Sequence, residues 1–81
     1  MKVDVQLFAR AKEIAGSDRV CLDLPDSARV VDVRTALAAR FPEMASLSSS
    51  LLIAVGTDYA DDAVPLDDAS QVACFPPVSG G

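Results

Sequence analysis

The apolar pattern of the sequence predicts an α+β domain of two layers, in which one helix covers one face of a β-sheet. Period-two alternation of apolar residues indicates strands near both ends of the chain, whereas a helical repeat occupies the middle. The chain has 81 residues, which allows one small domain. Its composition, 51% hydrophobic and 23% charged, is that of a globular domain rather than a disordered segment.

The first strand is predicted from three apolar residues that alternate with polar ones, Val3, Val5 and Leu7. Phe8 follows these residues with the opposite parity. We therefore expect its side chain to point away from the face that the other three bury, and to be exposed.

A short helix is predicted next, because residues 9–15 are rich in helix formers and Gly16 stands where a glycine commonly ends a helix. Residues 20–24 then alternate again between apolar and polar side chains, which predicts a second strand. Within that strand Cys21 falls on the polar side and is expected at the surface.

The main helix is predicted over residues 30–41, where apolar side chains recur at helical spacing: Val30, Val33, Leu37 and Phe41. Asp32 near its start and Arg40 near its end complement the helix dipole, and Pro42 ends it. Residues 43–50 contain four serines and are expected to form a loop.

The second half of the chain predicts three more strands. Residues 51–55 are apolar on both faces, which favours a central strand; residues 59–60 suggest a short strand, and residues 71–75 the last one. Strands before and after a single helix favour a β-grasp (ubiquitin-like) roll, with a mixed sheet of four to five strands covered by one main helix. We expect this domain to span residues 1–75 and a flexible tail to span residues 76–81.

Charge narrows the classes of partner. The net charge is −5 and the isoelectric point about 4.3, whereas binding to nucleic acid or to an anionic membrane needs a basic surface. We therefore predict no nucleic-acid and no membrane partner. The acidic balance reflects either solubility alone or docking on a basic partner protein.

Metal binding and secretion are also disfavoured. The two cysteines, Cys21 and Cys74, are far apart in sequence, and no histidine is present, so a zinc site is not expected. The acidic pairs at residues 61–62 and 67–68 lack the spacing of a calcium loop. No secretory signal precedes the first strand, and the longest apolar run is too short to cross a membrane, so we expect a cytoplasmic protein with reduced thiols.

The residues offer little for catalysis by the chain alone. Without histidine, a phosphate-binding loop or a metal cluster, an independent enzyme is not expected. The tail stands out instead: Pro76 and Pro77 stiffen its start, and Gly80 and Gly81 carry no side chain, so the end could enter a narrow active site. A frayed end is the alternative. The Gly81 carboxylate would need activation by ATP on another protein.

The ending Phe-Pro-Pro-Val-Ser-Gly-Gly, residues 75–81, closely resembles the MoaD branch of the MoaD/ThiS family of ubiquitin-like sulfur carriers. The resemblance extends to Leu-Phe-Ala at residues 7–9, to the Ala-Val pair at residues 54–55 and to the acidic pair at residues 67–68. It covers essentially the whole chain. A terminal Gly-Gly pair alone would be weak evidence, whereas the seven-residue run in a chain of this length is specific.

The resemblance implies the sulfur carrier of molybdopterin synthase, not catalytic alone and with no cofactor of its own. A MoeB-like enzyme would use ATP to adenylate Gly81, and a sulfur donor protein would supply the sulfur of a thiocarboxylate. A MoaE-like large subunit, joined with the carrier in a heterotetramer, would then use that sulfur to convert cyclic pyranopterin monophosphate. The partner-binding residues implied are Phe8, Phe75, Pro76, Pro77, Val78, Ser79 and Gly80.

Three alternatives remain open from the sequence. The chain could carry sulfur for thiazole or cysteine biosynthesis, it could be a ubiquitin-like protein modifier joined to lysines through Gly81, or it could be a plain binding module. Phe8 and Phe75 could also be core residues rather than a contact surface.

Overall fold

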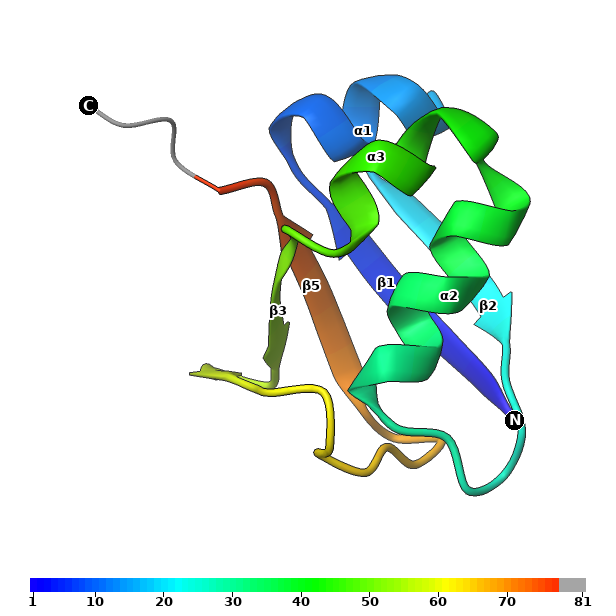
Figure 1. The fold of residues 1–81 in the computed structure, drawn as a ribbon. Coiled ribbons are helices and arrows are strands. Elements are labelled where there is room, and N and C mark those ends of the chain that lie inside the picture. Colours follow the sequence, from blue (N-terminus) through cyan, green and yellow to red (C-terminus); the bar gives the residue numbers. More distant parts are fainter. Residues whose placement is uncertain (78–81) are drawn as a thin grey trace.

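The computed structural model describes residues 1–77 and shows a mixed five-stranded sheet with its helices packed on one face (Figure 1). The strands are β1 (Lys2–Leu7), β2 (Arg19–Asp23), β3 (Leu52–Val55), β4 (Asp58–Tyr59) and β5 (Gln71–Phe75). Their order in the sheet is β2-β1-β5-β3-β4, with β1 parallel to β5 and every other pair antiparallel. The predicted β-grasp architecture is confirmed.

The helices are α1 (Ala9–Ala15), α2 (Val30–Arg40), a 3-10 turn η1 (Pro42–Met44) and α3 (Ala45–Ser48). At the start of α2 the Asp32 carboxylate accepts a hydrogen bond of 2.8 Å from the backbone N–H of Arg29. It thereby satisfies a backbone donor that the helix start would otherwise leave free. Gly16 ends α1 with φ 73°, as the sequence predicts.

The core lies between the sheet and α2. Every second residue of β1 is buried, and Val30, Val33 and Leu37 of α2 pack against the same face of the sheet. Val72 and Cys74 of β5 are also buried there. The residues of opposite parity in these strands therefore form an outer sheet face, which no helix within residues 1–77 covers (Figure 1).

Two expectations need correction. Residues 43–50 do not form a loop, because Met44 is fully buried and Leu47 packs against the core, so this segment folds as η1 and α3. The central strand is β5, not β3. β3 is apolar on both faces because Ile53 enters the core while Leu52 lies on the outer face.

Hydrogen bonds from the Arg34 side chain connect α2 to the second half of the chain. Its Nε donates to the Asp62 carboxylate at 2.7 Å, and its Nη1 donates to the carbonyl oxygens of Ser48 at 2.7 Å and Leu51 at 2.6 Å. The Arg34 side chain is only 17% exposed, whereas the Asp62 side chain is 57% exposed. The two carbonyl contacts should therefore contribute more to stability than the ion pair.

The β5 strand ends at Phe75, and Pro76 and Pro77 continue outside regular structure. Val78, Ser79, Gly80 and Gly81 lie outside the described residues, so the boundary between domain and tail stays a prediction. Among residues 1–77, none of the helices has the length and apolar character needed to cross a membrane.

Replacing Arg34 tests this arrangement. We expect Arg34→Met to lower the free energy of unfolding by about 2–4 kcal/mol, because two partly buried carbonyls lose their donor. Asp62→Asn, which removes only the exposed ion pair, should cost no more than about 1 kcal/mol. Urea unfolding of both variants measures the difference, and equal losses would show that the carbonyl contacts contribute little.

Candidate functional site: an aromatic patch on the outer sheet face

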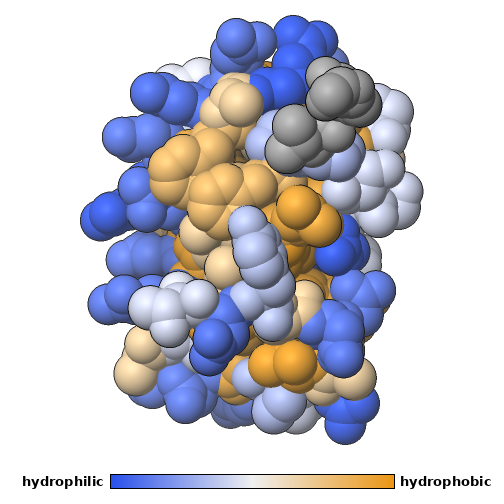
Figure 2. Space-filling view, turned by 90° about the vertical axis from the view of Figure 1, so that its left-hand side faces the viewer, coloured by the Kyte–Doolittle hydropathy of each residue, from blue (hydrophilic) through white to orange (hydrophobic). Residues whose placement is uncertain are grey.

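The outer face of the sheet carries a group of apolar side chains that no helix in the described part of the chain covers. We call Phe8, Leu52, Tyr59 and Phe75 the aromatic patch. Tyr59 is 72% exposed and Leu52 43% exposed, while Phe8 and Phe75 are half-buried. Figure 2 views the molecule from the β3 side of the sheet, where apolar residues gather in one area bordered by hydrophilic ones. An exposed apolar area rimmed by polar residues is typical of a protein-binding surface.

Phe75 contacts both of the other rings of the patch. The ring centroids of Phe8 and Phe75 lie 4.6 Å apart with their planes 9° from parallel, so the two rings stack. Tyr59 meets Phe75 edge-on, with the centroids 6.3 Å apart and an angle of 70° between the planes. Phe75 is thus held between two neighbours. Such ring pairs add stability beyond the area that they bury.

Strand register explains why these residues meet. In the parallel pair, Leu7 lies opposite Cys74, and both side chains enter the core. The next residue of each strand, Phe8 and Phe75, therefore faces outward at the same end of the sheet. In the antiparallel pair, Leu52 lies directly opposite Phe75.

The backbone after Phe8 keeps that ring at the sheet. Phe8 has the extended values φ −129° and ψ 153°, so it continues the alternation of β1. Ala9 then turns sharply with φ 52°, in the left-handed region that only glycine adopts without cost. The chain enters α1 at once, and Phe8 remains beside Phe75.

The expected partner-facing residues can now be placed. Phe8 points away from the core face as predicted, but it is half-buried rather than exposed, because the Phe75 ring covers one of its faces. Neither phenylalanine belongs to the core cluster. Pro76 is half-buried, and Pro77 is exposed. The remaining predicted site residues, Val78 to Gly81, lie outside the described residues.

Leu52 and Tyr59 are members of the patch that sequence reasoning missed as site residues. Leu52 belongs to a strand that is apolar on both faces, and this pattern already indicates a second apolar contact. Tyr59 is the single tyrosine of the chain and lies on the two-residue strand β4. Only the pairing of β4 with β3, which sets Tyr59 opposite Ala54, shows that its ring reaches Phe75.

The two cysteines have separate environments. Cys21 is exposed on β2, an edge strand, whereas Cys74 is buried in the core. Burial raises the pKa of the Cys74 thiol to about 12, so the thiol stays protonated and unreactive at neutral pH. Both thiols are free. Among residues 1–77, no group of His, Cys, Asp and Glu side chains is arranged to hold a metal ion.

Comparison with known proteins gives consistent matches over the whole chain. The model of the ThiS family matches residues 5–81. A molybdopterin synthase sulfur carrier subunit from Chlamydomonas reinhardtii is 31% identical over 83 residues, covering 100% of both chains.

Solved structures resemble the fold closely. A putative molybdopterin converting factor, subunit 1, from Pyrococcus furiosus is 31% identical with a TM-score of 0.85, covering 96% of this chain and 99% of that chain. Small archaeal modifier protein 1 of Haloferax volcanii is 27% identical with a TM-score of 0.85, covering 95% of this chain and 98% of that chain.

A double-mutant cycle tests the ring stack. Phe8→Leu and Phe75→Leu keep most of the apolar volume but remove the stacked rings, so we expect a coupling of about 0.5–1.5 kcal/mol in the free energy of unfolding. Urea unfolding of the single and double variants measures it. A cycle of Phe8→Leu with Val31→Ala, an exposed position on α2, is the control and should be additive. Additive effects of the two phenylalanine changes would mean that the rings do not stack in solution.

Proposed function

The chain belongs to the ThiS family, and on that premise we propose that it is the sulfur carrier subunit of a molybdopterin synthase. The relatives that bear this name match the chain along its full length. The family match alone does not separate this function from sulfur transfer to a thiazole or to cysteine. The names of the curated relatives favour the molybdopterin role.

The observation that carries the proposal is the continuity between the aromatic patch and the tail. Phe75 belongs to the patch and directly precedes Pro76 and Pro77. A partner that covers the patch therefore meets the start of the tail at the same time. The rings supply the kind of apolar anchor that dominates binding energy at protein interfaces, and the prolines limit the directions that the tail can take.

The chemistry proposed for the tail takes place at the carboxylate of Gly81. An adenylating enzyme joins this carboxylate to AMP and releases pyrophosphate from ATP. The terminal sulfur of a persulfide on a donor protein then attacks the acyl carbon, and AMP leaves. A thiol reduces the acyl disulfide that forms, which leaves a thiocarboxylate on Gly81 and a disulfide between that thiol and the donor cysteine. The thiocarboxylate donates its sulfur to cyclic pyranopterin monophosphate in the large subunit. Each carrier delivers one sulfur atom, so two carriers complete the dithiolene.

The side chains of this domain bear on which subunit supplies the catalytic groups. The chain contains no histidine, and its buried thiol is held protonated. We propose that the groups that bind and convert the pterin lie on the large subunit. The carrier contributes a docking surface, a stem of residues 76–80 and the reactive end at Gly81.

A second function is favoured by one specific observation, the similarity to small archaeal modifier protein 1. In this function the activated carboxyl of Gly81 would be attacked by a lysine amine of a target protein, forming an isopeptide bond. The same activation step serves both functions, but the acceptor differs. Isopeptide-linked adducts in an extract of the source cells, without exchange of sulfur, would favour the modifier.

Intact-mass measurement tests the carrier function. The chain is incubated with the adenylating enzyme of the same organism, ATP and a sulfur donor. We expect its mass to rise by the difference between sulfur and oxygen, because one terminal oxygen is replaced. Omission of ATP and deletion of Gly81 are the controls, and both should leave the mass unchanged. An unchanged mass of the full chain, with an enzyme proven active on another carrier, would contradict the proposal.

A further inference from the structure

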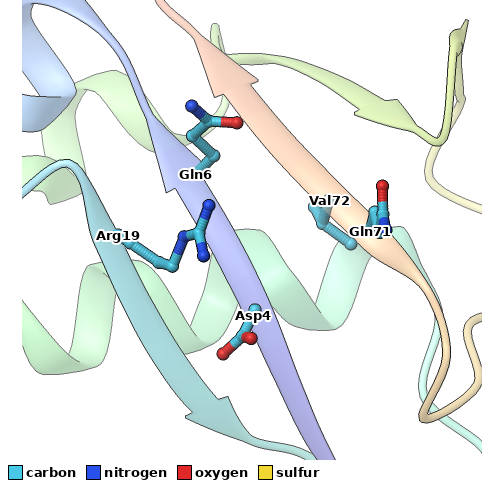
Figure 3. Close-up of a pocket in the computed structure, with 5 residues that line it drawn as sticks. All are labelled: Asp4, Gln6, Arg19, Gln71 and Val72. Carbon is cyan, nitrogen blue, oxygen red and sulfur yellow. The ribbon is translucent and has the colours of Figure 1, made fainter.

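A polar recess lies on the outer sheet face next to the aromatic patch. It has a volume of about 200 Å³ and is lined by Asp4 and Gln6 of β1, Arg19 of β2, and Gln71 and Val72 of β5. Figure 3 shows the Arg19 side chain extending over β1, between Gln6 and Asp4. Three strands therefore contribute to one hydrogen-bonding surface.

The recess continues the patch through the strand register. Gln6 lies opposite Ala73, and Ala73 lies opposite Ala54, which in turn pairs with Tyr59. These residues form one row across the outer face. Asp4 and Gln71 form the next row, farther from the Phe8–Phe75 stack. A partner that covers the patch therefore lies next to Gln6, and it must extend one row farther to reach Asp4 and Gln71.

The charges of the recess are not paired with each other. Within residues 1–77, neither Arg19 nor Asp4 makes a side-chain ion pair, and the side chains of Gln6 and Gln71 make no hydrogen bond to protein. Arg19 lies directly opposite Gln6 across the β1–β2 pair, whereas Asp4 lies opposite Cys21. The guanidinium and the Gln6 amide thus form a group of donors on the side of the recess that adjoins the patch.

We propose that this recess binds an acidic side chain, Asp or Glu, of the partner protein that covers the aromatic patch. The planar guanidinium of Arg19 offers paired donors that fit a carboxylate, and the Gln6 amide adds a third. The carboxylate of Asp4 lies in the next row. Because it repels another carboxylate, the acidic side chain of the partner is held near Arg19 and Gln6. The recess selects the partner and fixes its orientation on the sheet, which is the usual contribution of charged contacts at an interface. This inference rests on the proposed function.

Two substitutions with opposite expected effects test the recess. The measured quantity is the Kd of the full chain for the molybdopterin synthase large subunit of the same organism, at low ionic strength. Arg19→Gln should raise the Kd about threefold to tenfold, because the carboxylate loses its charged donor. Asp4→Asn should lower the Kd by up to about threefold, because a like charge near the carboxylate is removed. Both effects should shrink as salt is added.

Matched controls change the same charge elsewhere. Arg29→Gln and Asp68→Asn alter exposed residues that lie outside the recess, and they should leave the Kd unchanged. Thermal unfolding of each variant confirms that the fold is kept.

If Asp4→Asn raises the Kd while Arg19→Gln does not, the occupant is a basic side chain and the proposal is wrong. If neither substitution changes the Kd, the recess is no contact at all.

Failure of the recess and failure of the proposed function give different results. If Phe75→Ala raises the Kd but Arg19→Gln does not, the aromatic patch binds the partner and only the recess proposal is overturned. If the unaltered chain does not bind the large subunit, the proposed function fails, and the inference about the recess fails with it.

Discussion

The parallel pairing of β1 with β5 is the constraint on which the rest of this structure depends. It joins the first strand to the last, and its register places Leu7 opposite Cys74 in the core. Since side chains alternate, the same register brings Phe8 and Phe75 together on the other face. A slip of one residue would exchange the faces of a whole strand, so core packing also fixes the outer surface. Core packing and the position of the aromatic patch thus have a common origin.

This arrangement also links the surface to the tail. β5 lies at the centre of the sheet, between β1 and β3, and is held on both sides by hydrogen bonds. Phe75 is its last residue, so the chain leaves the central strand of the sheet directly from the aromatic patch. In the proposed function, the folded domain offers the partner a surface, and the chemistry takes place on the residues that follow it.

Local patterns in the sequence predicted most of the fold. Alternation identified β1, β2 and β5, and the helical repeat identified α2 to within one residue of its end. Residues 43–50 were misassigned because their serines suggested a loop, whereas burial of Met44 depends on contacts with distant residues. The order of strands in the sheet also placed β5, rather than β3, at its centre.

The candidate site was predicted only in part. The parity of Phe8 gave its direction correctly, and its half-burial could not be foreseen, because the ring that covers it is 67 residues further along the chain. Tyr59 and the recess around Arg19 depend on how strands pair across the sheet. Local sequence carries no record of that pairing. The roles of Val78 to Gly81 rest on family membership and on the chemistry of a glycine carboxylate.

The central claim is that the outer sheet face, and not the helical side, meets the partner. Cross-saturation NMR tests it directly: the large subunit is irradiated, and the loss of signal is measured on the aromatic and methyl groups of the bound carrier. We predict strong loss at Phe8, Leu52, Tyr59 and Phe75, and none at Val31, which is exposed on α2. Strong loss at Val31 with little change at the three rings would contradict the account.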